Sequence, residues 1–161
     1  MHAKTLFRVF LCAIALIAPS LLPAASPTLE GSWQLTFIPT TPATPTTQIP
    51  GLATFTSDGS VIETDGSELV SSPVASPGHG IWQVAPVSTE FYVQYISVVV
   101  NTDGSLAGKN VTIFTGVTIT TGSNSTTFNG NYVTDLVNPQ GTVQTTAGKV
   151  HGVLIPHPLL P

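Results

Sequence analysis

The stretch Ala53-Thr54-Phe55-Thr56-Ser57-Asp58-Gly59-Ser60-Val61-Ile62-Glu63-Thr64 decides the fold class of this chain. Two short runs rich in Thr, Val, Ile and Phe flank the pair Asp58-Gly59, and these residue types favour pleated, half-buried strands. An Asp-Gly pair between such runs is a strong hairpin signal, because both central residues can adopt a positive φ. The same signal recurs at Asp103-Gly104. We therefore expect strands that are neighbours in the sequence to be neighbours in space.

Beyond this hairpin, the chain after residue 25 has no helical periodicity, since apolar residues do not recur at three-four spacing. A string of antiparallel hairpins with no covering helix closes best into an up-and-down barrel, because closure removes exposed strand edges. The sequence therefore predicts an all-β fold, an antiparallel up-and-down barrel of about eight to ten strands, with a β-sandwich as the alternative. The expected strands are Ser32–Ile38, Leu52–Thr56, Ser60–Thr64, Gly80–Val84, Glu90–Val100, Ser105–Phe114, Gly116–Thr121, Thr126–Leu136, Thr142–Thr146 and Lys149–Leu154.

The composition excludes a disordered chain and a nucleic-acid-binding protein. Hydrophobic residues make up 42% of the 161 residues and charged residues only 7%, against about a quarter charged in a typical domain. After Ala25 the only basic residues are Lys109 and Lys149, against eight acidic ones. Binding to a phosphate backbone needs clustered Lys or Arg, so we expect no nucleic-acid partner.

Residues 1–25 have the order of a secretory signal peptide. Lys4 and Arg8 lie near the start, Val9–Ala18 is an uninterrupted apolar run, and small residues follow at Pro23-Ala24-Ala25. Ten apolar residues rise only about 15 Å as a helix, about half of what a membrane span needs. We predict a cleaved signal peptide, a single barrel domain over residues 26–161 with no transmembrane segment, and a secreted or periplasmic protein. The only cysteine lies in the leader, so the domain must be held together by its core alone.

Two long segments interrupt the strands. Residues 39–50 hold four prolines, and residues 65–78 combine Gly, Ser and Pro. Such composition predicts extended loops. If both loops emerge at one end of a barrel, they flank its mouth, where loops of this length are either functional or simply tolerated.

The order of motifs along the chain carries a family resemblance. Gly31-Ser32-Trp33 opens the first strand, and further motifs follow in the order Ala53–Val61, Gly78–Trp82, Asp103–Gly108, Thr126–Gly130 and Gly148–Ile155. This order resembles that of a group of small secreted bacterial proteins with a lipocalin-like fold. The resemblance spans nearly all of residues 26–161. It implies a calycin-like barrel and implies no particular chemistry.

Period-two alternation directs several large side chains toward the barrel interior. Trp33, Phe55 and Trp82 should point inward, where they either fill the core or line a cavity. Phe114, Phe128 and Tyr132 could plug one end or face the cavity. His79 lies between two glycines, which mark either a pocket or a bulge that begins a strand. The candidate ligand-binding residues, as the lining of a cavity, are Trp33, Phe55, His79, Trp82 and Phe114.

The run Glu90–Val100 is apolar on both faces, so alternation does not choose its inner face. Phe91, Val93 and Tyr95 share one face, while Tyr92 and Ile96 share the other. Such a strand is covered on both sides, faces lipid or forms an association surface.

Catalytic signals are few. The chain has no Gly-x-Ser-x-Gly elbow, Walker loop or dinucleotide fingerprint, and its histidines lack metal-ligand spacing. Asp58, Asp65 and Asp103 each precede a glycine and are explained by turn chemistry, which leaves Glu63 among the acids without a structural role. We expect no metal and no cofactor.

These observations predict a secreted, non-enzymatic barrel that binds a small apolar or amphipathic ligand, because small barrels enclose such pockets at their mouths. One alternative is a cofactor-free cyclase or isomerase, which would need polar groups such as His79 or Glu63. The other is a solid structural or surface-associated barrel. The deciding observation is the barrel interior: an open apolar cavity favours the ligand-binding barrel, and a filled interior favours the solid one.

Overall fold

The computed structural model describes residues 28–41, 47–66, 73–86 and 88–156, and no α-helix occurs among them. The predicted signal peptide, residues 1–25, lies outside this range. The strands are β1 (Gly31–Thr41), β2 (Ile49–Phe55), β3 (Ser60–Asp65), β4 (Val74–Ala75), β5 (Gly78–Val84), β6 (Phe91–Val100), β7 (Leu106–Thr121), β8 (Thr126–Val137) and β9 (Val143–Leu154).

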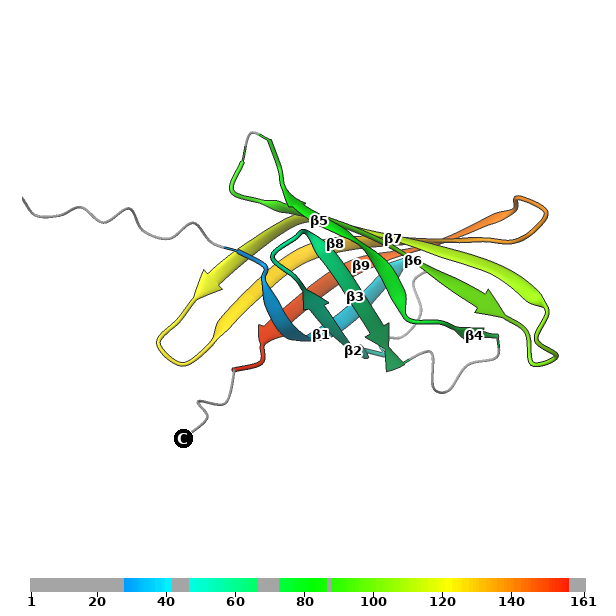
Figure 1. Ribbon diagram of the computed structural model, residues 1–161, viewed down its shortest axis with the longest axis horizontal. Coiled ribbons are helices and arrows are strands. Elements are labelled where there is room, and N and C mark those ends of the chain that lie inside the picture. Colours follow the sequence, from blue (N-terminus) through cyan, green and yellow to red (C-terminus); the bar gives the residue numbers. More distant parts are fainter. Residues whose placement is uncertain (1–27, 42–46, 67–72, 87, 157–161) are drawn as a thin grey trace, which may run out of the picture.

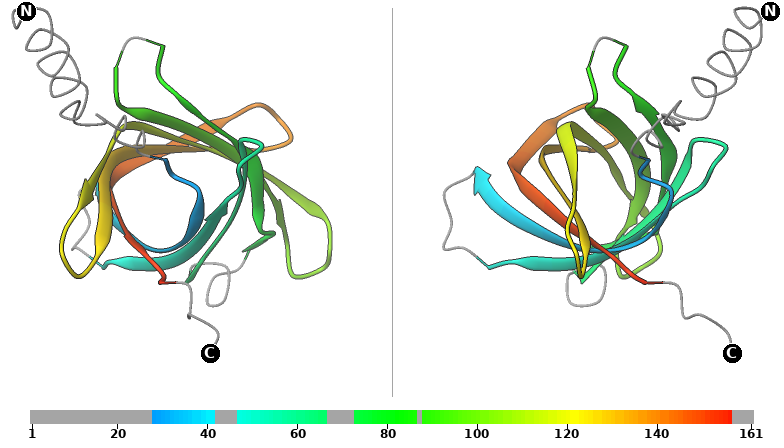
Figure 2. Two further views of the ribbon diagram at one scale, coloured as in Figure 1. Left: turned by 60° about the vertical axis from the view of Figure 1, so that its left-hand side comes forward. Right: turned by 90° about the vertical axis from the view of Figure 1, so that its left-hand side faces the viewer.

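The strands close into one barrel (Figures 1 and 2). The hydrogen-bonded order is β1-β2-β3-β5-β6-β7-β8-β9, and β9 pairs back onto β1. Every pair is antiparallel. The predicted all-β, up-and-down architecture is confirmed, and eight closed antiparallel strands are consistent with a calycin-like barrel.

Two expected strand breaks are wrong. The runs on either side of Thr115 form the single strand β7, which bends at a bulge where Gly116 adopts a φ of 60°. The two runs near the C-terminus are the single strand β9, whose pairing with β8 is continuous through Ala147 and Gly148. Glycine near these positions predicts the end of a strand. In β7 and β9, however, Gly116 lies at the bend of the strand and Gly148 lets neighbouring strands approach closely.

The short strand β4 was not expected from the sequence. It pairs with β6 on the same side as β5, so β4 and β5 resemble one strand interrupted at Ser76-Pro77. Pro77 has no N–H to donate, and the Ser76 hydroxyl accepts a hydrogen bond from the Val98 N–H in this gap. Pairing with β6 therefore continues past a proline.

Both Asp-Gly hairpins form, but by a different turn from the one expected. Only the glycines have positive φ, 86° at Gly59 and 82° at Gly104. Each aspartate keeps a negative φ, and its carboxylate accepts a hydrogen bond from the backbone N–H two residues later, at Ser60 and Ser105. The loops therefore have three residues with one glycine in the left-handed region, because the carboxylate caps the turn locally.

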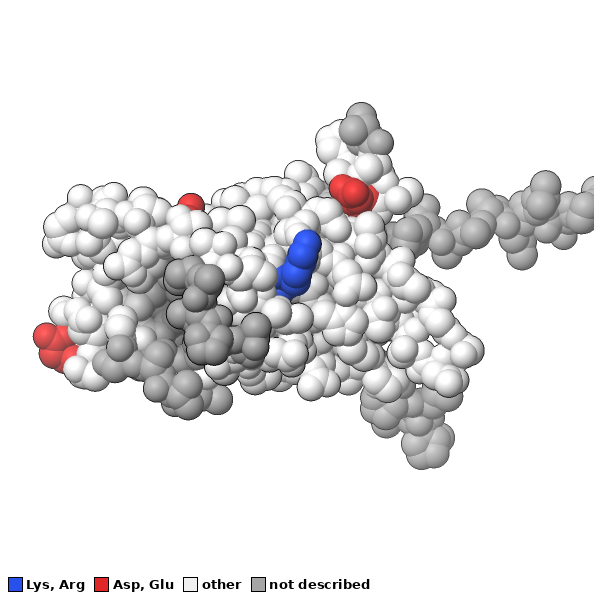
Figure 3. All heavy atoms as spheres, turned by 180° about the vertical axis from the view of Figure 1, so that it is seen from behind, with Lys and Arg blue, Asp and Glu red and all other residues white. Residues whose placement is uncertain are grey.

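The core is the inward-facing half of each strand. Its largest fully buried side chains are Trp33, Phe55, Phe91, Phe114 and Phe128. Tyr95 and Ser97 also point inward from β6, while Ile96 and Val98 on the outer face are 42% and 48% exposed. The inner face of β6 is thus covered by the core, and its outer face is solvent-exposed on the described chain. Charged side chains are sparse on the face seen in Figure 3.

Candidate functional site

The barrel interior has two unlike halves. At one end, aromatic rings fill it: Trp33 and Phe128 lie 5.0 Å apart between centroids, Trp82 and Phe91 5.9 Å, and Phe55 contacts both Trp82 and Phe128 edge-on. These tilted and edge-to-face ring pairs add to the stabilisation from burial. This half is a solid core.

The other half encloses a partly open cavity of about 260 Å³. Its inner boundary is aromatic. Phe37 packs edge-on against Tyr132 at 5.2 Å between ring centroids, and Phe114 lies behind Phe37 and Tyr95 at 5.8 and 5.7 Å. Phe37, Tyr95 and Tyr132 line the cavity, whereas Phe114 supports two of them from the core side.

Polar side chains form most of the remaining wall. Thr112 on β7 and Thr134 on β8 face each other directly in the register, and their hydroxyl oxygens lie 2.9 Å apart. The other lining residues are Ile49, Glu63, Asp65, Ala75, Ser97, Asn110, Leu136, Gln144 and Thr146. An apolar floor below a wall of hydroxyl, amide and carboxyl groups is the usual composition of a small-molecule site, although this volume is just below the common range of about 300–1,000 Å³.

Two carboxylates enter the cavity from β3. The inward parity of this strand begins at Val61, so residues 63 and 65 point to the same side. Glu63 is only 3% exposed. Asp65 is half-buried at the end of the strand. Its assignment to turn chemistry is therefore wrong, because the sheet continues through Asp65 and its pairing with Gly51.

Two glycines on β5 make room for Tyr95. A Cβ at Gly78 would lie 2.5 Å from Cδ2 of the tyrosine ring, and one at Gly80 would overlap the Gln94 carbonyl oxygen and lie 2.5 Å from the Tyr95 Cα. Gly80 and Tyr95 are direct partners in a regular register. The Gly-His-Gly motif therefore begins a strand, as one interpretation held, but without a bulge between these partners. Its purpose is to seat a cavity tyrosine.

The tyrosines in the cavity are held in their neutral form. Burial raises the pKa of Tyr95 well above its ordinary value of 10.0, and the nearby charge of Glu63 raises it further. Burial also raises the pKa of Tyr132, with a second contribution from the charge of Asp65. Desolvation and a neighbouring anion both disfavour phenolate. At neutral pH both groups therefore present uncharged rings and hydroxyls.

Both long loops leave the barrel at the cavity end. Phe37 and Ile49, on the strands that flank the first loop, line the cavity, and so do Asp65 and Ala75 on either side of the second. The strand ends thus agree with the expectation that these loops flank one mouth. Residues 42–46 and 67–72 of the loops themselves lie outside the described residues.

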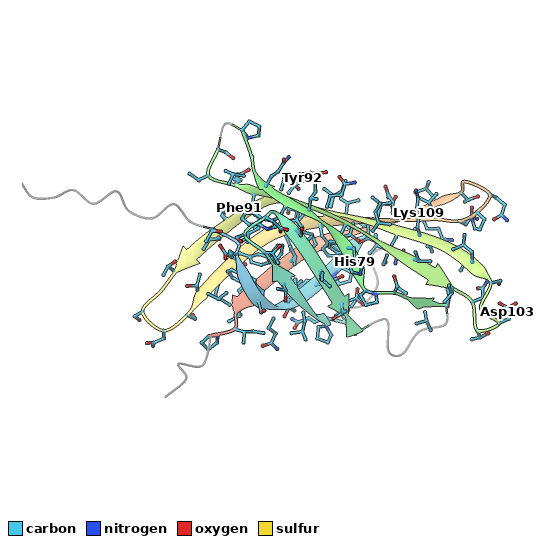
Figure 4. All side chains as sticks on the ribbon, viewed as in Figure 1. His79, Phe91, Tyr92, Asp103 and Lys109 are labelled. Carbon is cyan, nitrogen blue, oxygen red and sulfur yellow. The ribbon has the colours of Figure 1, made fainter. Side chains whose placement is uncertain are left out.

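None of the five residues predicted to line a cavity is among the lining residues of this one. Trp33, Phe55 and Phe114 are buried in the core, and Trp82 packs against it. His79 points outward and is exposed, between Ile62 and Ile96 in the register. In Figure 4, His79, Asp103 and Lys109 are spread along the barrel rather than gathered at one place. Phe55 also borders a separate and more open groove of about 620 Å³ at the aromatic end.

The cavity residues that were missed carried a usable signal. Alternation from Val61 places Glu63 and Asp65 on the inner face, and the inward series of β6 changes from Phe91 and Val93 to Tyr95 and Ser97. Acidic and hydroxyl groups at inward positions of an otherwise apolar barrel indicate a cavity. The sequence-based prediction of the cavity lining instead chose large aromatic residues, whose size favours filling the core.

No group of three or more His, Cys, Asp or Glu residues among those described could hold a metal ion. Within the same part of the chain, no helix is long and apolar enough to cross a membrane. No protein-family model matches the chain, and neither a curated protein nor a solved structure matches it.

Proposed function

We propose that this protein is a secreted, non-enzymatic barrel that binds a small amphipathic molecule in the cavity at the polar end of the barrel interior. The observation that carries the proposal is the division of the interior into a solid aromatic half and a hollow polar half. A purely structural barrel gains by filling its interior, because an empty volume forfeits packing contacts. Here, inward positions that could hold large apolar groups hold Ser97, Thr112 and Thr134 instead.

The chemistry of the wall favours an amphipathic ligand over a wholly apolar one. The floor of Phe37 and the two tyrosine rings suits an apolar group, and the hydroxyl and carboxyl groups above it suit polar atoms. A wholly apolar molecule would offer no hydrogen-bonding partner to the hydroxyl, amide and carboxyl groups that line the wall. A ligand with one apolar and one polar end meets both requirements.

Export of the protein is part of this proposal. It rests on the order of charged, apolar and small residues in residues 1–25. The resemblance to small secreted bacterial proteins points the same way. A binding protein outside the cytoplasm would meet its ligand in the surrounding medium.

The test is a thermal-shift and calorimetric screen of the purified protein with small aryl alcohols, phenols, arylamines and aromatic acids. A ligand that binds only the folded state raises the melting temperature by mass action. The variant Ser97→Leu fills the cavity from β6 and should abolish binding, while Val98→Leu, one residue away on the outer face, should bind like the parent protein. Unchanged binding by Ser97→Leu would place the site elsewhere.

A screen in which no compound binds would contradict the proposal. A surface-associated barrel would then be favoured by a specific observation, the exposed aliphatic side chains of Ile62, Ile81 and Ile96 on adjacent strands. Concentration-dependent self-association, measured by sedimentation, is the readout for that function.

A further inference from the structure

We propose that the ligand of this cavity is a small organic cation, an amine whose positive charge is held by Glu63 and Asp65 and whose apolar part lies against the rings of the floor. The inference rests on the proposed function, since it names the chemical class of ligand for the same site. It comes from the charge of the lining residues and from the kind of surface beside that charge.

The described residues that line the cavity include two carboxyl groups and no Lys, Arg or His. The rest of the domain has few basic side chains. Lys109 and Lys149, the only Lys or Arg residues after Ala25, are both exposed. Lys149 donates a hydrogen bond to Asn131, which is exposed as well. A ligand cation would therefore meet an interior of negative charge without competition from a lining Lys, Arg or His side chain.

Burial strengthens this preference. Glu63 is 3% exposed, at a depth where charges are screened by water far less than at the surface, so a cation beside it would strongly favour the ionised carboxylate and be held by it. Asp65 lies two residues further toward the mouth on the same strand. The two carboxyl groups thus form a path of negative charge from the mouth to the interior, which attracts cations and repels anions.

The aromatic floor fits a cation better than a neutral polar group. Phe37, Tyr95 and Tyr132 line the same cavity as the carboxylates. The face of an aromatic ring is negative, and a desolvated ammonium beside it gains cation–π stabilisation. Because both tyrosines stay neutral, their rings keep this property, and the Tyr132 hydroxyl oxygen can accept a hydrogen bond from an amine.

A divalent metal ion fits the same residues less well. Calcium takes six to eight oxygen ligands, usually with several carboxylates among them, whereas no group of three or more His, Cys, Asp or Glu residues in the described part of the chain could hold a metal ion. A cavity of about 260 Å³ is also far larger than a single ion. Both features suit an organic ammonium with an attached apolar group.

The test uses three probes of nearly equal size: benzylamine, benzyl alcohol and benzoate. Calorimetry on the purified protein at neutral pH should show that benzylamine binds most tightly. Benzyl alcohol should bind at least about tenfold more weakly, because it lacks the charge-assisted hydrogen bond. Benzoate should not bind, because its negative charge is repelled by the carboxylates. Glu63→Gln preserves shape and removes the charge. It should weaken benzylamine about tenfold or more and leave benzyl alcohol nearly unchanged.

Controls separate the possible failures. Glu90→Gln removes an exposed charge and should alter none of the affinities. If Glu63→Gln does not fold, Asp65→Asn serves in its place, since its site is less buried. Equal binding of benzylamine and benzyl alcohol, both lost in Ser97→Leu, would overturn the cation assignment and leave the proposed function intact.

Binding of none of the three probes, together with an empty wider screen, would remove both proposals. Calcium chloride is titrated in the same way to test for a metal ion at this site. Tight calcium binding that depends on Glu63 and excludes benzylamine would replace the organic cation with a metal ion and overturn the inference.

Discussion

The indole N–H of Trp33 donates a 2.7 Å hydrogen bond to the backbone carbonyl oxygen of Leu29, and both residues are buried. Leu29 precedes β1 and is fully covered within the core cluster. The segment just before the first strand is therefore fixed to the aromatic half of the barrel. Leu29 thus helps to cover the aromatic end of the core, at the opposite end of the barrel from the cavity of about 260 Å³.

The complete burial of the Leu29 side chain predicts a large loss of stability when that side chain is shortened. Leu29→Ala should lower the free energy of unfolding by about 2–5 kcal/mol, because it removes buried apolar atoms and leaves a void. Urea denaturation of the variant measures the loss. Glu30→Ala, at the exposed neighbour, is the matched control and should change stability by less than about 0.5 kcal/mol. Equal stability of the two variants would show that Leu29 does not cover the aromatic end of the core.

Processing of the leader should leave Leu29 in place. We expect the exported protein to begin near Ser26, because the small residues at Pro23-Ala24-Ala25 follow the apolar run. Intact-mass analysis of protein recovered outside the cytoplasm checks this. An exported species that keeps residues 1–25 would contradict the prediction of a cleaved signal peptide.

The close approach of β5 and β6 predicts that Gly80 tolerates no side chain. Gly80→Ala should destabilise the protein by about 1–3 kcal/mol or more, because the added methyl group meets backbone atoms of Gln94 and Tyr95 that cannot move independently of the sheet. Gln83→Ala on the exposed face of the same strand is the control. Chemical denaturation compares them, and a neutral Gly80→Ala would mean that the two strands separate easily here.

The hairpin turns predict a stability change in acid. A hydrogen bond from the Ser105 side chain, followed by one from its backbone N–H, lowers the pKa of Asp103 from its ordinary value of 3.8, and hydrogen bonds from Thr56 and Ser60 act likewise on Asp58. A depressed folded-state pKa stabilises the fold above the unfolded value. That contribution is lost as the pH falls below 3.8 and through the folded value.

Carboxyl carbon NMR titration should place the Asp103 midpoint below 3.8. Ser105→Ala should move it upward, because it removes the hydrogen bond from the Ser105 hydroxyl, which lowers the pKa of Asp103 most. Thr102→Ala, beside the aspartate in the same exposed turn, serves as the control and should leave the midpoint in place. If Ser105→Ala leaves the Asp103 midpoint unchanged, the lowered pKa of Asp103 has another cause.

The separation of the two halves predicts which aromatic signals a ligand perturbs. Binding in the cavity should shift the ring resonances of Tyr95 and Tyr132, which line it, and leave the Trp33 indole N–H in place. Proton NMR of the protein with and without saturating benzylamine provides the measurement. A shift of the Trp33 indole alone would locate binding at the aromatic end.

Strand composition and turn residues were enough to predict the barrel, because a Thr- and Val-rich chain with Asp-Gly turns and no helical period has few ways to bury its apolar faces. The cavity was harder to predict. Its floor depends on the pairing of Gly80 with Tyr95 and on Phe114 packing behind Phe37, contacts between residues distant in sequence. Alternation predicts that a side chain points inward but not at which height of the barrel it lies. That height separates the core residue Trp33 from the cavity residue Tyr132.

The two-part interior also bears on how such a protein changes over time. Trp33, Phe128 and their neighbours hold the fold together, while Ser97, Thr112 and Thr134 sit where no large side chain completes the packing. Under the proposed function, substitutions at Ser97, Thr112 and Thr134 would change ligand preference while leaving the aromatic core cluster unaltered. Selection on the proposed ligand site and selection on the aromatic core would therefore act on largely different residues of the same barrel.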